Sequence, residues 1–148
     1  MLKQGLIMSG MVFIAGLASA DPADVGGVWL TEAQDGIVRI DDCGDGTPCG
    51  TLVWFDETNA ASDRDINNPD PELRDRPVKG MVMLSGFERS GDRWRRGRIY
   101  NAENGRTYRS AVSVRDDGNL KLQGCVGPIC QTQTWTPLPE DDPRVTGD

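Results

Sequence analysis

The chain contains no histidine and only three lysines among its 148 residues. Histidine is the commonest general base near neutral pH, so its absence removes the most frequent catalytic arrangements. The motifs Gly-x-Ser-x-Gly and His-Glu-x-x-His, which mark many hydrolases and zinc peptidases, are also absent. Carboxylate pairs such as Asp63 and Asp65 leave a glycosidase as a possible activity. An enzyme is therefore the third of three functional hypotheses.

Long apolar runs are also scarce, because the only one lies at residues 5–17. A run of this length is shorter than the about 20 residues that span a bilayer. Lys3 precedes it, and Ala18-Ser19-Ala20 follows with the small-x-small spacing of a signal peptidase site. We therefore expect residues 1–20 to be a signal peptide, with a periplasmic or secreted product that is not embedded in a membrane.

Positive charge is in short supply once the leader is removed. The remaining chain has 148 − 20 = 128 residues and a net charge of 15 − 23 = −8, because Lys3 leaves with the leader. Proteins that bind nucleic acids need a basic surface for phosphate contacts. The composition therefore excludes nucleic acid as an expected partner.

The four cysteines are expected to form two disulfides, since an exported chain meets an oxidising environment. Cys43 and Cys49 flank the turn sequence Gly-Asp-Gly-Thr-Pro, and Cys125 and Cys130 flank Val-Gly-Pro-Ile. Three pairings are possible, and these turns favour bonds within each pair. Neither spacing matches the usual zinc knuckle, so no metal is expected at the cysteines.

Residues 21–136 lack a helical pattern and instead alternate short β-rich runs with turn signals. Asn104-Gly105, for example, predicts a two-residue hairpin with both residues at positive φ. Eight antiparallel strands in a meander avoid exposed edges best by closing into a barrel, so the predicted fold is all-β. The expected strands are Val28–Glu32, Ile37–Asp42, Cys49–Phe55, Val78–Phe87, Arg93–Tyr100, Arg106–Arg115, Asn119–Cys125 and Cys130–Thr136. A long loop at 56–77 interrupts this single domain, and the acidic, proline-containing residues 137–148 predict a disordered tail.

Several short motifs together resemble a family of small exported bacterial proteins called domain of unknown function 2147. The motifs are Gly27-x-Trp29-Leu30, Val38-Arg39-Ile40 with Cys43, Cys49-Gly50 with Val53-Trp54, Asp65-Ile66-Asn67-Asn68-Pro69-Asp70-Pro71, Gly80, Trp94 with Gly97 and Ile99-Tyr100, Gly105-Arg106-Thr107-Tyr108, and Gln133-Thr134-Trp135-Thr136. The resemblance implies a lipocalin-like barrel that binds a small apolar ligand. One position departs from the family pattern, because Pro137 stands where such sequences commonly carry an arginine.

Aromatic and arginine side chains are the candidates for ligand contacts. The predicted ligand-binding residues are Trp29, Trp54, Arg96, Arg98, Tyr100, Tyr108 and Trp135. The acyl chain of an amphipathic anion would lie inside the barrel, with its head near Arg96 or Arg98. The alternatives are that the tryptophans only fill the core and that the arginines form a solvated face. Strand periodicity places Arg96 and Arg98 on the face of Trp94, unless Gly97 marks a bulge.

The loop segment 63–70 begins like a calcium-binding loop, with oxygen-bearing side chains at alternate positions. Its sixth position is Asn68 instead of glycine, and its twelfth is Arg74 instead of glutamate, so the EF-hand interpretation fails. A series of Asx and proline turns is the simpler interpretation, and it suits a structured lid over a barrel mouth. The side chains expected to contact a partner there are Asp65, Asn67, Asn68 and Asp70.

Two non-enzymatic hypotheses follow, and neither requires a cofactor. The first is a periplasmic binding protein for a small apolar or amphipathic ligand. The second is an envelope interaction or support module with a filled barrel, in which loop 56–77 forms the partner surface. An open cavity of several hundred Å³ favours the first hypothesis, and a solid core favours the second.

Overall fold

The computed structural model describes residues 10, 12 and 21–147. The expected signal peptide, residues 1–20, lies almost entirely outside this part of the chain. The elements are β1 (Gly27–Leu30), β2 (Gly36–Asp42), β3 (Pro48–Phe55), η1 (Pro71–Leu73), β4 (Val82–Ser85), β5 (Glu88–Ser90), β6 (Arg93–Asn101), β7 (Arg106–Val114), β8 (Leu120–Val126), β9 (Ile129–Leu138) and α1 (Pro143–Thr146). Within the described residues, no helix is long and apolar enough to cross a membrane.

The strands close into an antiparallel barrel with eight places, as the sequence predicts, because β4 and β5 both pair with β6 and together fill one place. Consecutive strands pair with each other except β4 and β5, β1 pairs with β9, and an additional β4–β6 pairing closes the sheet. Every pairing is antiparallel. The closed meander leaves no long unpaired edge, which is the physical reason for closure.

The predicted strand Val78–Phe87 is wrong in its bounds, because the segment forms two short strands. Leu84 and Ser85 of β4 pair with Ile99 and Arg98, and β5 continues the same register further along β6. Gly86 adopts φ +76 between the two strands. The chain therefore breaks at Gly86 and Phe87, and the Phe87 side chain turns into the core.

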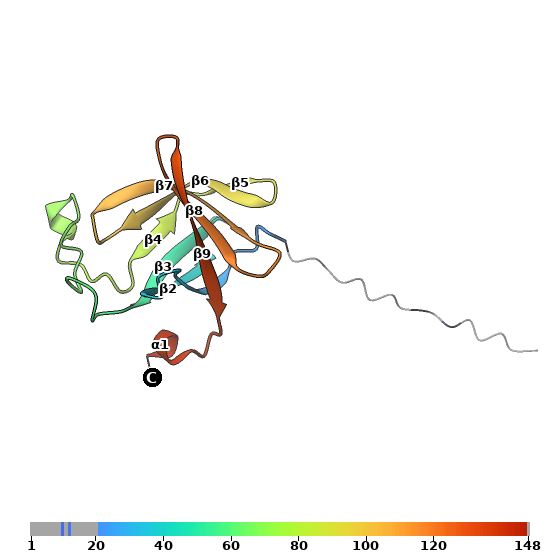
Figure 1. The fold of residues 1–148 in the computed structure, drawn as a ribbon, viewed down its shortest axis with the longest axis horizontal. Coiled ribbons are helices and arrows are strands. Elements are labelled where there is room, and N and C mark those ends of the chain that lie inside the picture. Colours follow the sequence, from blue (N-terminus) through green and yellow to red (C-terminus); the bar gives the residue numbers. More distant parts are fainter. Residues whose placement is uncertain (1–9, 11, 13–20, 148) are drawn as a thin grey trace, which may run out of the picture.

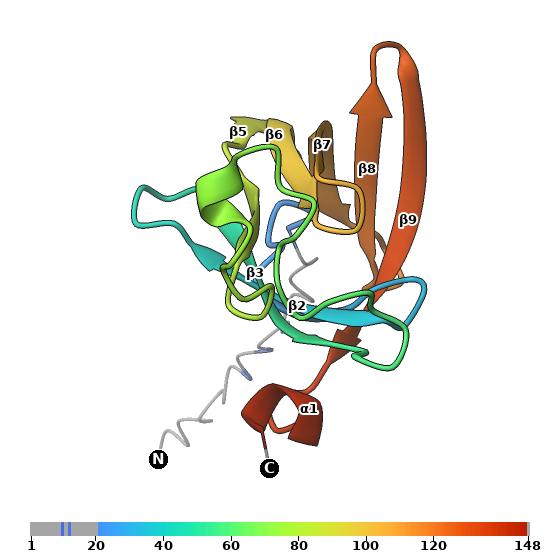
Figure 2. The same ribbon diagram turned by 90° about the vertical axis from the view of Figure 1, so that its left-hand side faces the viewer.

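One end of the barrel is filled with large apolar side chains. The buried cluster includes Val25, Trp29, Phe87, Val112 and Leu120. Residues 21–26 lie across this end of the barrel (Figure 2), where they bond to β6 and β7. The Trp29 indole donates a hydrogen bond to the Val25 carbonyl at 2.9 Å. Burial of these side chains, at about 25 cal/mol per Å² of apolar surface, stabilises the fold. This half of the barrel is called the closed end below.

The tail differs from the predicted disordered segment. Strand β9 continues to Leu138, which pairs with Val28, and residues 143–146 form the turn of helix α1. The Arg144 guanidinium stacks over the Trp54 ring at 5.4 Å on the outside of the barrel. Figure 1 shows α1 beyond the end of β9. Cation–π stacking therefore gives this acidic segment a specific contact that composition does not reveal.

Candidate functional site: a cavity at the open end of the barrel

A cavity of about 950 Å³ occupies the end of the barrel opposite residues 21–26. Its apolar wall is formed by inward-facing strand residues, and Trp135 lies at its inner end. The wall residues are Leu52, Met83, Ile99, Leu122 and Trp135. Ligand sites in proteins typically have volumes of about 300–1,000 Å³ and mostly apolar walls. The size and lining therefore match a site for one small molecule.

The polar groups of the cavity are mostly uncharged. Tyr108, Gln131 and Gln133 project from β7 and β9 into it, and Asn101 and Asn104 lie at its rim. The Trp135 indole donates a hydrogen bond to Gln133 Oε1 at 2.9 Å. The side-chain nitrogen of Gln133 takes no part in this contact. Such amide and hydroxyl groups fix the orientation of a ligand through neutral hydrogen bonds.

The three charged side chains among the lining residues are Asp35, Arg64 and Glu103. All three come from turns or from loop 56–77, so they lie at the rim. Their sum is one negative charge. The interior therefore lacks the cationic group that would hold a carboxylate or phosphate head.

Loop 56–77 borders the cavity and is fixed by the buried carboxylate of Asp65, which is fully inaccessible to solvent. Tyr100 donates its hydroxyl hydrogen to Asp65 Oδ1 at 2.6 Å. Asn68 and Arg76 donate to Oδ2 at 2.8 and 2.9 Å. The Arg76 guanidinium also lies 5.7 Å from the centre of the Tyr100 ring. We call these four side chains the Asp65 cluster; it joins the loop to strand β6.

The Asp65 cluster is built around an ionised carboxylate. Burial by itself raises the pKa of Asp65, but the hydrogen bonds from Tyr100, Asn68 and Arg76, with the Arg76 charge, hold it below its ordinary value. Burial and the neighbouring carboxylate raise the pKa of Tyr100 to about 12. The tyrosine therefore stays a hydrogen-bond donor, and the carboxylate stays an acceptor, across the neutral pH range.

A second contact joins the loop to the β6–β7 turn. The Asn67 side chain donates to the Glu103 carbonyl at 2.9 Å. A Cβ atom on Gly105, which has φ +70, would lie 1.9 Å from the Asn67 carbonyl oxygen. The turn itself spans residues 102–105, because Asn101 pairs with Arg106, and only Gly105 in it has positive φ. The predicted two-residue turn is therefore wrong. Gly105 is needed because loop 56–77 passes too close to the turn to leave room for a side chain.

The predicted tryptophan sites fall in three different places. Trp135 lines the cavity. Trp29 lies in the closed end, and its indole is already paired with a main-chain carbonyl. Trp54 lies on the outer surface against Arg144. Position 137 pairs with Trp29 across β1 and β9, so Pro137 occupies the place beside this tryptophan.

The predicted arginine sites lie outside the cavity. A β-bulge between Trp94 and Gly97 places Arg96 at φ +55, so the simple period-two pattern does not hold there. The Arg96 side chain is 81% exposed and contacts Glu88 at 3.4 Å. The Arg98 guanidinium lies beside Gly86, on the opposite face from Ile99. Neither arginine is placed to hold the head of a ligand inside the barrel.

Tyr100 and Tyr108 both border the cavity, with different roles. Tyr100 is engaged by Asp65, whereas the Tyr108 hydroxyl accepts a hydrogen bond from Asn104 at 2.8 Å and keeps its own hydrogen. Alternation along β7 and β8 identifies Tyr108 and Leu122 as inward-facing, but the sequence gives no sign that Leu52, Met83 or Gln133 would join them. Those residues come from strands that meet only when the barrel closes.

The loop residues expected to contact a partner are used mainly within the loop. Asp65 and Asn68 are buried in the Asp65 cluster, and Asn67 is bonded to the β6–β7 turn. Asp70 accepts a hydrogen bond from the Glu72 main chain and caps η1. No cluster of three or more histidine, cysteine or acidic side chains suited to a metal ion occurs in the described part of the chain.

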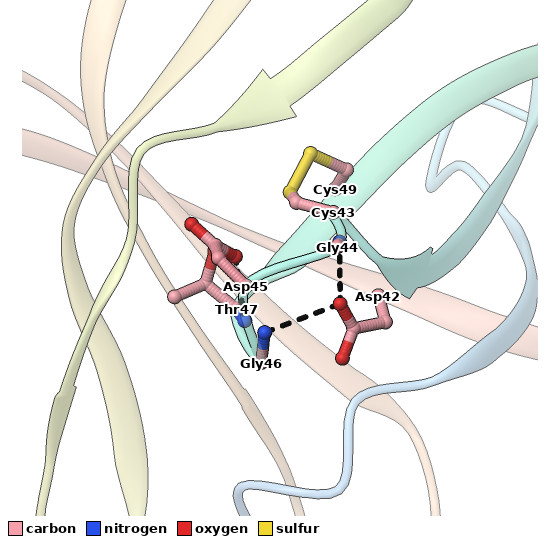
Figure 3. Close-up of a disulfide and its surroundings, with 7 residues drawn as sticks. All are labelled: Asp42, Cys43, Gly44, Asp45, Gly46, Thr47 and Cys49. Atoms are coloured by element: carbon pink, nitrogen blue, oxygen red, sulfur yellow. Dashed lines mark hydrogen bonds between the residues drawn. A yellow bond between two sulfur atoms is a disulfide. The ribbon is translucent and has the colours of Figure 1, made fainter.

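Both predicted disulfides are confirmed: Cys43 is bonded to Cys49, and Cys125 to Cys130. Asp42 Oδ1 accepts hydrogen bonds from the main-chain nitrogens of Gly44 and Gly46 at 2.5 and 3.2 Å, which shapes the first loop (Figure 3). This loop contributes no residue to the cavity lining, whereas Val126 and Ile129, inside the second disulfide, do.

Residues 27–137 match the family model described as an uncharacterised protein conserved in bacteria, DUF2147. The chain belongs to this family. Among solved structures, the DUF2147 chain is similar to protein HP1028 from the human pathogen Helicobacter pylori, which is described as belonging to the lipocalin family. The two share 25% sequence identity with a TM-score of 0.71, and the match covers 82% of this chain and 88% of the other. No curated protein matches the sequence.

Proposed function

We propose that this DUF2147 protein is a non-enzymatic binding protein that holds one small apolar or amphipathic molecule in its barrel, in the periplasm or outside the cell. The observation that carries the proposal is the cavity of about 950 Å³ with its apolar wall. The leader-like residues 1–20 and the two disulfides support the location. The likeness to a lipocalin-family protein supports the ligand class.

An uncharged polar head suits this cavity better than an anionic one. Burying each CH2 group of an acyl chain contributes about 0.8 kcal/mol, and Leu122 and Trp135 supply the surface for it. Tyr108 and Gln133 supply donors and acceptors for a hydroxyl or carbonyl group. A carboxylate buried inside the barrel would lose its hydration without gaining a cationic partner, since Arg64, the one cation among the lining residues, lies at the rim, and this is costly. The preferred ligand is therefore a neutral amphiphile.

The absence of catalysis is supported by the chemistry of the site. The sequence has no histidine, and all four cysteines are in disulfides. Asp65, the one buried carboxylate of the described residues, is already held by three donors. Its low pKa makes it a poor proton donor at neutral pH.

A matched ligand panel tests the proposal. 1-Dodecanol, monolauroylglycerol and laurate share one chain length and differ in the head. We expect the two neutral compounds to change tryptophan fluorescence, because Trp135 lines the cavity, and to raise the melting temperature. Laurate should bind more weakly at pH 8. If no member of the panel changes either signal, the proposal fails.

Two variants locate the site. Tyr108→Phe removes one hydroxyl from the wall and should weaken monolauroylglycerol binding by about three- to tenfold, the range for one hydrogen bond. Arg96→Gln is the control, because its side chain is exposed on the outside of the barrel. Equal loss in both variants would contradict binding within the cavity.

A further inference from the structure

Two arginines face each other on the outer surface beside the cavity. Arg98 of β6 pairs directly with Arg109 of β7, which in turn pairs with Cys125 of β8. Like charges directly opposite each other destabilise a sheet. Neither arginine forms an ion pair with any residue of the described chain. Arg106, at the start of β7, is a third exposed cation at this end and is likewise without an ion pair there.

The neighbouring β8–β9 hairpin ends in exposed aliphatic side chains. Val126 and Ile129 are 62% and 73% exposed, and the Cys125–Cys130 disulfide closes the hairpin directly behind them. Figures 1 and 2 both show this hairpin projecting beyond the rest of the barrel. We call Val126–Ile129 the hairpin tip. It is held in a fixed shape although it buries little of its own apolar surface.

The cations and the hairpin tip are physically joined. An Arg109 guanidinium nitrogen donates a hydrogen bond to the Gly127 carbonyl, within the tip. A convex aliphatic tip with arginines at its base has the composition of a surface that enters the interface of a bilayer, where cations meet phosphates and aliphatic groups meet acyl chains. A flat protein partner would leave a protruding tip poorly packed.

We propose that the hairpin tip and the mouth-side arginines Arg98, Arg106 and Arg109 dock the protein on an anionic phospholipid surface. Val126 and Ile129 also line the cavity, so docking would bring the cavity mouth to the lipid. The proposal goes beyond ligand binding and does not depend on it. The chain is acidic overall, with a net charge of −7. Contact must therefore be local, and we expect it to weaken steeply with salt.

Vesicle sedimentation tests this proposal directly. The exported protein is mixed with vesicles of phosphatidylglycerol and phosphatidylcholine in equal parts, or with vesicles of phosphatidylcholine alone. Its intact mass is measured first, so that all samples are known to have the same N-terminus. We expect sedimentation with the mixed vesicles at low salt and little with the neutral ones. Each arginine should contribute about a fivefold factor to the partition coefficient.

Matched variants assign the contact. Arg98→Gln/Arg109→Gln should lower partitioning at low salt by about 25-fold, from the same factor per arginine. Val126→Ser/Ile129→Ser should also lower partitioning at low salt. The controls are Arg93→Gln, at the far end of β6, and Val82→Ser, an aliphatic side chain on β4 that is 50% exposed. Both controls should bind as the wild type does.

A tryptophan at the hairpin tip reports contact with the bilayer directly, so this test does not depend on comparing variants that could differ in folding. Ile129→Trp should give a blue-shifted emission on mixed vesicles that is lost at high salt. No sedimentation with mixed vesicles at low salt overturns the proposal. Binding to an acidic peptide without binding to vesicles would also overturn it, because the arginines would then serve a soluble partner. Equal loss in the controls would show nonspecific adsorption and contradict the assigned surface.

Discussion

Inward-facing side chains alternate along the strands at both ends of the barrel, but they fill one end and leave a cavity at the other. At the closed end, Trp29, Phe87 and Val112 fill the interior, and residues 21–26 cross the opening. At the open end, Gly124, Tyr108 and the two glutamines leave a cavity of about 950 Å³. The strands are continuous between the two, so the difference lies in side-chain volume and in what covers each opening.

The coverings also differ in chemistry. The closed end is sealed by apolar packing and by indole hydrogen bonds to main-chain carbonyls, such as Trp94 to Ala23 at 2.8 Å. The open end is bordered by loop 56–77, which is held by the charged Asp65 cluster and the contact of Asn67 with the β6–β7 turn. An apolar seal is insensitive to pH, whereas a carboxylate contact is lost on protonation. The following predictions test this contrast.

The largest effect is expected at the closed end. Trp29→Ala removes a buried side chain that is 4% exposed and should lower the free energy of unfolding by about 3–5 kcal/mol. Ile129→Ala, at the open end, should change it by less than about 0.5 kcal/mol. Urea unfolding followed by circular dichroism measures both. Similar losses would mean that the two ends are packed alike.

The next effect concerns the Asp65 cluster. Asp65→Asn leaves Arg76 without its carboxylate and should cost about 2–3 kcal/mol at pH 7, less than for a fully buried pair because Arg76 is partly exposed. The folded-state pKa of Asp65 is depressed, so its stabilisation is complete above the unfolded value of about 4 and disappears as pH falls through the folded one. The difference between wild type and variant should therefore shrink in acid. A difference that is constant from pH 7 to pH 2 would refute the ionised cluster.

A smaller effect is expected at Gly105. Gly105→Ala forces a Cβ atom towards the Asn67 carbonyl oxygen, whereas Gly118→Ala has a similar φ of +83 and open space around it. Backbone strain should lower the free energy of unfolding of both variants by about 1 kcal/mol. Gly105→Ala should lower the free energy of unfolding more than Gly118→Ala does, and it should also increase amide exchange in residues 62–68. Equal behaviour of the two variants would show that the loop does not depend on this approach.

The smallest effect should be at Ser110, between the two ends. Its side-chain oxygen is buried and has no hydrogen-bond partner within the described residues. Ser110→Ala removes an unsatisfied polar group, so stability should stay level or rise by about 1 kcal/mol. Thermal unfolding measures this. A clear loss of stability would mean that the hydroxyl has a partner in the folded protein.

The sequence predicts the barrel better than the site. Turn signals and alternation along Tyr108–Val112 and Leu120–Leu122 depend only on local residues, so the strands and their inward faces could be read directly. The disulfides were equally local. Gly97 signals the bulge next to Arg96 only as an alternative to simple alternation, and no local pattern predicts the break at Gly86, because both arise where Phe87 must fit against Gly97 in the core.

The residues of the cavity and of the Asp65 cluster were harder to predict, because they are far apart in the sequence. Chemistry alone singled out Arg96, Arg98 and Trp54, but strand direction places them outside the barrel. The pairing of Asp65 with Arg76 and Tyr100 depends on how loop 56–77 folds onto β6, which no local pattern specifies. The predicted turns of that loop did identify it as structured.

One end of the barrel holds a cavity and the other is filled, and substitutions at two glycines distinguish the two ends. A Cβ atom on Gly124 would make only ordinary contacts, the nearest 3.9 Å from Ile99, whereas one on Gly50 would lie 2.8 Å from the Leu84 side chain. Both residues face the interior, so each can receive the same leucine.

The measurement is the free energy of unfolding and the affinity for monolauroylglycerol of Gly124→Leu and Gly50→Leu. We expect that Gly124→Leu fills the cavity, keeps a free energy of unfolding within about 1 kcal/mol of the wild type and no longer binds monolauroylglycerol. Gly50→Leu should lose about 1–3 kcal/mol or more from overpacking. If Gly124→Leu is destabilised as strongly as Gly50→Leu, or still binds monolauroylglycerol with wild-type affinity, the ligand does not bind in a cavity at the open end.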